Sequence, residues 1–272
     1  MIPYSTFAEM YSYMLYDVLY NPHYETAPRG KAIKERINTS YMCSNPMSNL
    51  FSNRVRNIPQ KYLAGELLWY FTGDNSLDVI SKYSGFWSNI ANDDGTLNSA
   101  YGHLLFTRKT PSGLNQWEWA LQSLQKDKDS RQAIMYFGRP DFQETGVKDF
   151  VCTAYAMFLI RKNKLHMHLY MRSNDLVKGT TFDIPFFMLL QQQMWLHLKE
   201  SYPDLELGCY FHNATSLHIY EQDFGLVQDM LGASFDRHEL PPIGRNLINE
   251  HGECQISRDV NDDLYIWLHN NI

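Results

Sequence analysis

The sequence is poor in cysteine and has no long apolar run. Its 272 residues include four cysteines, and no two of them have the C-x-x-C spacing of a zinc or redox pair. We therefore expect four free thiols rather than a disulfide set: Cys43, Cys152, Cys209 and Cys254. No apolar run approaches the roughly 20 residues of a membrane-spanning helix, and the start lacks the basic and apolar regions of a signal peptide. These absences predict a soluble cytoplasmic protein that binds no membrane.

Positive charge is also scarce, because the formal net charge is −6 at pH 7. A broad surface for nucleic acid needs clustered Lys and Arg, so direct nucleic-acid binding is not expected. A local pocket that binds an anion is compatible with this net charge. The chain has neither G-x-x-x-x-G-K-[ST] nor G-x-G-x-x-G, which leaves sites for nucleoside triphosphates and dinucleotides without support. No linker, low-complexity tract or internal repeat divides the chain. We therefore expect one domain over residues 1–272 with a substantial core.

The apolar residues recur with the periods of an α/β (α+β) protein. Helical spacing predicts helices over residues 7–18, 61–71, 117–124 and 186–198. Apolar and β-branched runs predict strands over residues 133–137, 151–160, 164–171, 209–211 and 216–220. Residues 21–57 predict loops and short strands, residues 98–102 predict a turn, and the tail after Arg245 gives no clear signal. We expect a single mixed β-sheet packed with helices.

The stretch from Asp149 to Phe187 carries the densest chemistry of the chain. Its two expected strands are joined by a short basic turn, Arg161-Lys162-Asn163, which predicts a hairpin. Cys152 lies at the start of the first strand. An arginine and two aspartates follow the expected end of the second strand: Arg172, Asp175 and Asp183. The hairpin can therefore place a thiol, a cation and carboxylates in one cavity.

Cys152 can be a nucleophile or a buried apolar residue. A cysteine in an apolar strand usually packs as a small hydrophobe, so the residue alone favours the second interpretation. A nucleophilic thiol needs thiolate character, which a nearby cation such as Arg172 can supply. Arg172 with Ser173 also makes a reasonable phosphate clamp. The alternative for Arg172 is a surface salt bridge with Asp175.

Glu66 lies inside an apolar helical pattern, where an ionised carboxylate is costly unless it is paired or used. The alternative is a position at the solvent edge of the helix.

The alternation Leu165-His166-Met167-His168 places two histidines on one strand face. Because no third ligand lies nearby in the sequence, surface or core histidines are favoured over a metal pair, and no metal is expected.

Several motifs in one order resemble the thymidylate synthase family from about Phe7 to Phe224. The matching segments are, in chain order, Glu66 to Asp74, Asp129-Ser130-Arg131, Cys152, Arg172 to Asp175 with Gly179, and Ser216 to Tyr220. They are similar to the family's ELLWFLxGD and DSR segments, its nucleophilic cysteine, its RSxD run with the following glycine, and its ribose-binding HxY segment. Several spaced motifs in the right order are more specific than any one motif. The resemblance therefore favours functional roles for Cys152 and Glu66.

The chain departs from the synthase pattern at positions that resemble the phage deoxycytidylate hydroxymethylase branch. Asp183, the twelfth residue when Arg172 is counted as the first, stands where synthases have asparagine. Thr153 stands where synthases have the histidine that follows the nucleophile. Tyr101-Gly102 is followed by His-Leu-Leu instead of Gln-Trp-Arg, and Gln132 replaces the arginine after DSR. The residues that resemble the hydroxymethylase branch are Asp183, Thr153, Met171 to Asp175, and Ser216-Leu217-His218.

The resemblance implies a thymidylate synthase-like fold, a homodimer with shared sites, and a folate-dependent reaction on a pyrimidine nucleoside monophosphate. The expected substrate is dCMP, the expected cosubstrate is 5,10-methylenetetrahydrofolate, and the expected product is 5-hydroxymethyl-dCMP, made through a covalent adduct of Cys152. The enzymatic alternatives are C5 methylation of dCMP or CMP, and a dUMP-specific synthase or hydroxymethylase. A silent relative that binds a nucleotide or a partner, and a structural or nucleic-acid-binding protein, are the non-enzyme alternatives. A viral source would place the reaction in the host cytoplasm.

The resemblance also implies a role for each candidate residue. The expected catalytic residues are Cys152 as nucleophile, Glu66 in proton transfer and water ordering, Tyr101 in a hydrogen-bond network near the C5 proton, and Asp183 in base selection. The residues expected to bind phosphate and sugar are Arg29, Arg172, Ser173, His218, Tyr220 and, across a dimer, Arg131 of the partner subunit. The residues expected near the folate are Trp87, Asp175 and Gly179.

Overall fold

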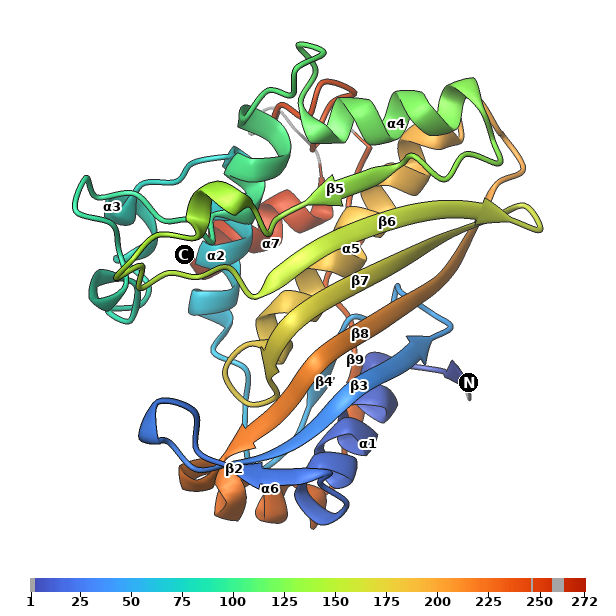
Figure 1. Cartoon of the computed structure of the whole chain (residues 1–272). Coiled ribbons are helices and arrows are strands. Elements are labelled where there is room, and N and C mark those ends of the chain that lie inside the picture. Colours follow the sequence, from blue (N-terminus) through green and yellow to red (C-terminus); the bar gives the residue numbers. More distant parts are fainter. Residues whose placement is uncertain (1–2, 246, 256–261) are drawn as a thin grey trace. The chain divides into compact units, whose positions relative to one another are not determined.

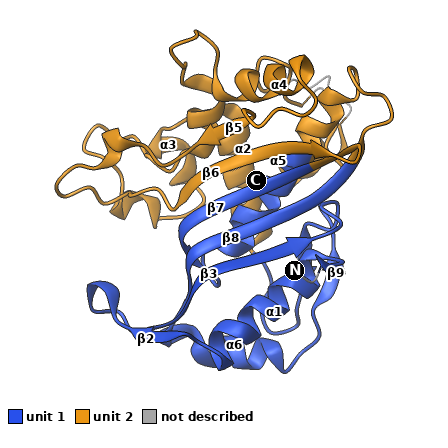
Figure 2. Cartoon of the chain, turned by 45° about the vertical axis from the view of Figure 1, so that its right-hand side comes forward, with its two compact units in different colours: residues 1–58, 166–191, 207–240 blue, residues 59–165, 192–206, 241–272 orange. Residues whose placement is uncertain are grey.

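A computed structural model of the chain describes residues 3–245, 247–255 and 262–272. Residue contacts divide the chain into two compact units, each built from separate stretches (Figure 2). Unit 1 comprises Met1–Ile58, His166–Gln191 and Leu207–Leu240, and unit 2 comprises Pro59–Leu165, Gln192–Glu206 and Pro241–Ile272. The single catalytic domain over residues 1–272 stays a prediction.

Unit 1 is a β-sheet with helices packed on it. Its elements are β1 (Pro3–Tyr4), α1 (Phe7–Tyr20), β2 (Tyr24–Thr26), the 3-10 turn η1 (Pro28–Gly30), β3 (Ile33–Cys43), β4 (Leu50–Ser52), most of β7 (Lys164–Asp175), the start of α5 (Thr180–Leu198), most of β8 (Glu206–Tyr220), η5 (Glu221–Asp223), α6 (Phe224–Leu231) and β9 (Asp236–His238). The strand order is β1-β3-β8-β7, β2 pairs with β3, and β4 pairs with β9. In Figure 1, β3, β8 and β7 lie side by side.

The helix α1 forms because Thr6 caps it and its apolar residues share one face. The Thr6 hydroxyl accepts a hydrogen bond from the Glu9 backbone N–H at 3.1 Å, which satisfies one free donor of the first turn. The buried residues of α1 recur at helical spacing and pack toward β3: Phe7, Met10, Tyr11, Met14, Leu15 and Val18. The helix expected over residues 7–18 is confirmed.

The expectation of only short strands in residues 21–57 is wrong, because β3 runs without a break from Ile33 to Cys43. β3 pairs antiparallel with β8, from Ile33 opposite Tyr220 to Cys43 opposite Tyr210. The two short strands expected over residues 209–211 and 216–220 are likewise one strand, β8. Both strands carry polar side chains in their middle, so their stability comes from pairing that an apolar pattern does not reveal.

Unit 2 is richer in helices. Its elements are α2 (Gln60–Thr72), α3 (Leu77–Ile80), η2 (Trp87–Asn89), the π-helical turn η3 (His103–Thr107), α4 (Gln116–Lys126), β5 (Ile134–Tyr136), η4 (Pro140–Phe142), β6 (Thr153–Arg161) and α7 (Asp263–Asn271). α2 ends at Gly73, whose left-handed backbone (φ 69°) is typical of a glycine that terminates a helix. α4 begins with a capping box between Asn115 and Glu118. β5 pairs antiparallel with β6, and a left-handed turn at Lys162 and Asn163 follows β6, as the hairpin prediction requires.

Two element boundaries differ from the sequence prediction, and one helix was not predicted. β7 continues to Asp175, so Arg172 and Asp175 lie within the strand and not after it. α5 begins at Thr180 and not at residue 186, so Asp183 lies in its first turn. Pro185 lies inside α5 and concealed this earlier start, because proline is uncommon inside a helix. The tail contains α7, which packs against α2; a helix of nine residues leaves only a weak periodic signal.

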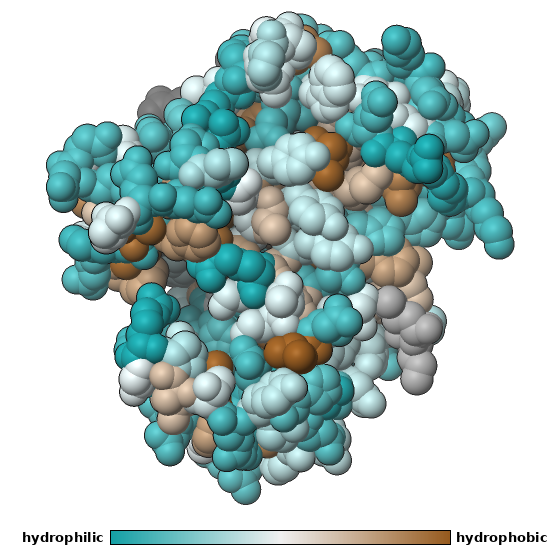
Figure 3. All heavy atoms as spheres, in the orientation of Figure 1, coloured by the Kyte–Doolittle hydropathy of each residue, from teal (hydrophilic) through white to brown (hydrophobic). Residues whose placement is uncertain are grey.

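The surface and the thiols agree with the composition. Each of the four cysteines, all of which lie within the described residues, is a thiol and not half of a disulfide, as predicted. The face in Figure 3 carries mostly hydrophilic side chains. Within the part of the chain that the structure describes, no helix has the length and apolar character needed to cross a bilayer.

Gly102 is required by a close approach of two backbones. Its φ is −61°, which any residue adopts, but a Cβ built there would lie 1.5 Å from the carbonyl oxygen of Tyr70 in α2. Gly102→Ala should therefore lower the free energy of unfolding by roughly 1–3 kcal/mol or more. Urea denaturation measures the change. Gly85→Ala is the matched control, because a Cβ at Gly85 meets no atom within 4 Å. Equal denaturation midpoints for the two variants would contradict the packing argument.

Candidate active site

Glu66 is a buried carboxyl group held by two other side chains of unit 2. It is only 6% exposed, so the alternative at the solvent edge of the helix is wrong. Tyr62, one helical turn earlier in α2, donates its phenolic hydrogen bond to Glu66 Oε1 at 2.7 Å. Trp87 Nε1 in turn donates to the Tyr62 oxygen at 3.1 Å. The indole hydrogen occupies the phenol oxygen as a donor and so directs the Tyr62 O–H toward Glu66.

Burial raises the pKa of Glu66 to about 7, and the hydrogen bonds from Tyr62 and Tyr70 oppose that rise. A carboxyl group that titrates near neutral pH can both accept and release a proton during a reaction. Perturbed pKa values of this kind concentrate at functional sites. These are properties that a general acid and base requires, and the expected role of Glu66 in proton transfer stays a prediction.

Tyr101 connects this carboxyl group to the segment that carries Cys152. The ring of Tyr101 stacks on Tyr70, with centroids 5.0 Å apart and planes 18° apart. The hydroxyl of Thr153 donates to the Tyr101 oxygen at 2.9 Å, and Thr153 is fully buried. Cys152, directly before Thr153, is half-buried. Unit 2 therefore brings Glu66, Tyr101 and the chain at Cys152 into one line of contacts.

Asp149 supports the same segment, and sequence reasoning missed it. Its carboxylate, 3% exposed, accepts hydrogen bonds from the Ser99 backbone N–H at 2.7 Å and from the Ser99 hydroxyl. Its carbonyl oxygen accepts a hydrogen bond from the Asn98 amide at 3.1 Å. Burial raises the pKa of Asp149, and the Ser99 hydrogen bonds oppose the rise. Asp149 thus ties the loop before Tyr101 to the segment before Cys152. A carboxylate three residues before the candidate nucleophile was the available sequence signal.

Arg131 lies elsewhere in unit 2. It is exposed and lines a groove of about 880 Å³ together with residues of α4 and of the 127–132 loop, among them Trp119, Lys126 and Asp129. Glu66, Trp87, Tyr101 and Cys152 do not line this groove. The structure therefore does not place Arg131 with the other candidates of unit 2.

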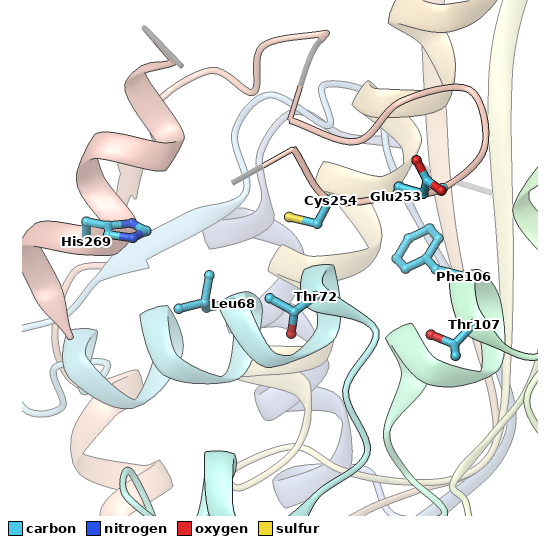
Figure 4. Close-up of a pocket in the computed structure, with 8 residues that line it drawn as sticks. Leu68, Thr72, Phe106, Thr107, Glu253, Cys254 and His269 are labelled. Atoms are coloured by element: carbon cyan, nitrogen blue, oxygen red, sulfur yellow. The ribbon is translucent and has the colours of Figure 1, made fainter. Parts of the chain in front are cut away.

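Figure 4 shows a second hollow of unit 2, about 600 Å³ in volume, that is also separate from Glu66. Leu68 and Thr72 of α2, Phe106 and Thr107 of η3, and His269 of α7 line it, with residues 252–254. Leu68 follows Glu66 by two residues, so the two side chains point to different sides of the helix. None of the candidate site residues lines this hollow.

In unit 1, the ends of β7 and β8 gather the residues expected to bind a nucleotide. The Leu176 N–H donates to the His218 carbonyl at 3.0 Å, so the segment after β7 meets the end of β8. His218 and Tyr220 form an edge-to-face ring pair with centroids 5.2 Å apart. Burial lowers the pKa of His218. The negative charge of Asp175 raises that pKa, and the positive charge of Arg29 lowers it further. Arg29 and Asp175 therefore lie within electrostatic reach of His218. Arg172 and Ser173 belong to the same stretch of β7 as Asp175.

Asp175 and Gly179 shape the turn that leads into α5. Asp175 Oδ1 accepts hydrogen bonds from the Val177 N–H at 2.8 Å and the Lys178 N–H at 3.0 Å. A Cβ at Gly179 would lie 3.1 Å from Asp183 Oδ2 and 3.3 Å from the Asp175 carbonyl oxygen. Asp175 thus has a structural role in the turn, and Gly179 allows Asp183 to approach. Their expected contacts with the folate stay predictions.

The two histidines of β7 are used in packing, which agrees with the preference for a non-metal role. His166 Nδ1 accepts a hydrogen bond from the Cys209 backbone N–H at 3.0 Å. The ring of His168 stacks on Phe211, with centroids 4.2 Å apart and planes 2° apart. Among the described residues, no group of three or more His, Cys, Asp and Glu side chains has the arrangement of a metal site.

The Tyr62 hydrogen bond gives a testable pH dependence. Tyr62→Phe removes a donor that stabilises the charged form of Glu66, so the pKa of Glu66 should rise above about 7. We expect a rise of about one unit, since a hydrogen bond to a charged group contributes roughly 1.5–3 kcal/mol and a pKa unit corresponds to about 1.4 kcal/mol. A carbon-13 NMR titration of the labelled glutamate carboxyl measures it. Tyr202→Phe is the control, because that phenol donates to the Leu124 carbonyl. An unchanged midpoint in Tyr62→Phe would contradict the assignment.

Comparisons with known proteins show which family the chain belongs to. Residues 9–253 match the profile of the family described as thymidylate synthase. The chain is 28% identical over 231 residues to the deoxyuridylate hydroxymethyltransferase of Bacillus phage SP01, which covers 80% of this chain and 59% of that protein. It is 30% identical over 174 residues to the deoxycytidylate 5-hydroxymethyltransferase of Enterobacteria phage T4, which covers 61% of this chain and 70% of that protein. The chain thus spans about 59% of the length of the Bacillus phage relative.

The fold is also similar to that of a solved structure. Thermostable thymidylate synthase A from Bacillus subtilis matches with a TM-score of 0.70 over 96% of this chain and 95% of that chain. The sequence identity is 20%, so this likeness concerns the fold alone. It confirms the expected α/β fold with a mixed sheet and helices. Together with the match over residues 9–253, these observations show that the chain belongs to the thymidylate synthase family.

Proposed function

We propose that the protein transfers a one-carbon unit from 5,10-methylenetetrahydrofolate to C5 of a pyrimidine nucleoside monophosphate, converting dCMP to 5-hydroxymethyl-dCMP. The observation that carries this proposal is the line of contacts from Glu66 through Tyr70 and Tyr101 to Thr153, directly after Cys152. It provides a nucleophile and a group that exchanges protons near neutral pH. The names of two phage relatives, both hydroxymethyltransferases, support the same reaction class.

In the proposed reaction, the Cys152 thiolate adds to C6 of the pyrimidine, which makes C5 nucleophilic. When bound, the folate would supply the one-carbon unit as an electrophilic methylene group that C5 attacks, and it would leave as tetrahydrofolate when the C5 proton departs, so that an exocyclic methylene group remains on the nucleotide. Tyr101, fixed by the Thr153 hydrogen bond, takes part in the network around the proton that leaves C5. Glu66 moves protons and orders the water that adds to the exocyclic methylene group of the nucleotide. Loss of the thiolate from C6 then restores the aromatic ring and releases the product.

The nucleotide is proposed to lie at the ends of β7 and β8. Arg172, Ser173 and Arg29 are suited to hold its phosphate, because guanidinium and hydroxyl groups donate to phosphate oxygens. His218 and Tyr220 are proposed to hold the sugar. The pKa effect of Arg29 on His218 supports a cation beside this part of the site.

The subunit arrangement and the folate contacts are also proposals. The exposed position of Arg131 supports a homodimer in which Arg131 of the partner subunit reaches the phosphate. The residues proposed to contact the folate are Trp87, Asp175 and Gly179. Trp87 is buried and packs edge-to-face on Trp69, with ring centroids 5.3 Å apart.

Three features support water rather than hydride as the group that completes the product. Trp87 is followed three residues later by Ile90, where synthases have a second tryptophan, and His103 replaces the first residue of their Gln-Trp-Arg run. Residues 263–271 form the helix α7 on α2, where synthases have a tail that closes over the folate. A hydride transfer needs water to be excluded, and the loss of the second tryptophan and of the bulk of the whole Gln-Trp-Arg run leaves room for water.

A second candidate is hydroxymethylation of dUMP. The Bacillus phage relative is named for that base, and its match covers 80% of this chain, against 61% for the T4 relative. Asp183 favours dCMP, because a carboxylate accepts a hydrogen bond from the cytosine 4-amino group. The O4 oxygen of uracil is itself an acceptor, so a carboxylate repels it.

Product analysis tests the proposed reaction. The enzyme is incubated with methylenetetrahydrofolate and dCMP, CMP or dUMP, and we expect the mass of 5-hydroxymethyl-dCMP with no absorbance change from dihydrofolate. Cys152→Ala is the control, and it should bind dCMP yet form no product, because phosphate and sugar contacts supply most of the ground-state affinity. Dihydrofolate formed one-to-one with product would instead identify a dCMP methyltransferase. Nucleotide binding without turnover of any substrate would identify a silent relative.

Asp183→Asn tests the choice of base. Asparagine offers a donor and an acceptor that suit uracil O4 and N3–H, so the variant should shift its preference from dCMP toward dUMP. A mismatched buried hydrogen-bond pair costs about 1–3 kcal/mol, which is roughly a 10- to 100-fold change in the ratio of kcat/KM values. Equal use of dCMP and dUMP by the unmodified enzyme would rule out this role for Asp183.

A further inference from the structure

Three buried polar residues of unit 1 form a line of hydrogen bonds that ends on Asp183. Tyr210 and His212 lie on β8 and are fully buried, and Asn174 lies near the end of β7 and is 2% exposed. The Tyr210 oxygen lies 3.1 Å from His212 Nδ1, and His212 Nε2 lies 2.9 Å from Asn174 Oδ1. Asn174 Nδ2 donates to Asp183 Oδ2 at 3.3 Å. We call Tyr210, His212 and Asn174 the Asn174 relay. The reaction proposed above gives these three residues no part.

The direction of every bond in the relay follows from the protonation of His212. Burial lowers the pKa of His212 to about 3, so at neutral pH the ring carries a single N–H. Nε2 faces a carbonyl oxygen, so that hydrogen lies on Nε2. Nδ1 is then an acceptor, and the Tyr210 hydroxyl must donate to it. Burial also keeps the pKa of Tyr210 well above its usual value, so the phenol retains its proton.

The orientation of the Asn174 amide, on which this assignment depends, is supported by the Thr180 hydroxyl on one side and the Asp183 carboxyl group on the other. Its Oδ1 accepts from His212 Nε2 and from the Thr180 hydroxyl, the latter at 2.7 Å. Because two donors face Asn174 Oδ1, the NH₂ group on the other side of the amide points at Asp183 Oδ2. The reversed amide would set oxygen against oxygen there, an arrangement that requires a proton on Asp183. Gly179 makes room for this contact, since a Cβ there would lie 3.1 Å from Asp183 Oδ2 and 3.6 Å from Asn174 Nδ2.

We propose that Asn174, oriented by His212 and Tyr210, is a positioning residue that keeps Asp183 Oδ2 a hydrogen-bond acceptor and thereby sets the preference for cytosine over uracil. This inference rests on the proposed role of Asp183 in base selection. An N–H donor at Oδ2 favours the ionised carboxyl group, which attracts the cytosine 4-amino group and repels uracil O4. The relay reaches the base only through Asp183, so it does not take part in bond making or breaking.

Asn174→Asp tests the proposal, because it keeps the side-chain shape and replaces the NH₂ donor with an oxygen. Two carboxyl oxygens about 3.3 Å apart must then share a proton, and the ratio of kcat/KM for dCMP over dUMP should fall roughly 10-fold or more. His212→Phe removes the donor that orients Asn174 and should lower the ratio by a smaller factor. His197→Phe is the matched control: His197 is also a buried histidine, but it contacts Gln193 and Ile248 in unit 2. Its ratio should match that of the unmodified enzyme.

Nitrogen-15 NMR of labelled histidine gives a readout that does not depend on activity. We expect His212 of the unmodified protein as the neutral Nε2–H tautomer. An Nδ1–H tautomer, or an unchanged base ratio in folded Asn174→Asp, would overturn the proposal, as would an equal loss in His197→Phe. A lack of dCMP preference in the unmodified enzyme would instead refute the proposed role of Asp183. The tautomer then still shows whether the relay has the direction inferred here.

Discussion

A buried polar atom needs a hydrogen-bond partner, and the clusters in both units depend on this constraint. Glu66 is removed from water among the apolar residues of α2, so Tyr62 and Tyr70 supply the donors that water would otherwise provide. In unit 1, Asn174 and His212 are also buried, and a hydrogen bond between Asn174 Oδ1 and His212 Nε2 gives each of these atoms a partner. Because few arrangements satisfy all donors and acceptors at once, burial fixes the direction of each bond.

Fixed directions matter for the proposed chemistry. A general acid and base must hold its proton on a defined oxygen, and the Tyr62 hydrogen bond engages one oxygen of Glu66. A base-selecting carboxyl group must present acceptors in defined places, and the Asn174 amide engages Oδ2 of Asp183. In both cases a neutral amide or phenol positions the carboxyl group, so its electrostatic environment is set before the substrate arrives.

Local signals predicted the elements that they govern. The apolar period predicted α1 and α2. The sequence could not predict β3 and β8 at full length, because their polar middle residues depend on pairing between segments more than 170 residues apart, such as Tyr41 and His212. Pro185 concealed the start of α5, and the short helix α7 owes its place to packing on α2.

By itself the sequence determined the family, because the order and spacing of its motifs can be recognised without knowing the fold. It also pointed to Glu66, as a carboxylate in an apolar helix, and the family resemblance pointed to Cys152 and Asp183. Only the tertiary structure decided which groups surround them. Asp149 meets Ser99 from 50 positions away, and His212 meets Asn174 from 38 positions away. Hydrogen bonds act over about 3 Å in space and leave no periodic trace along the chain, so these partners became visible only once the strands were paired.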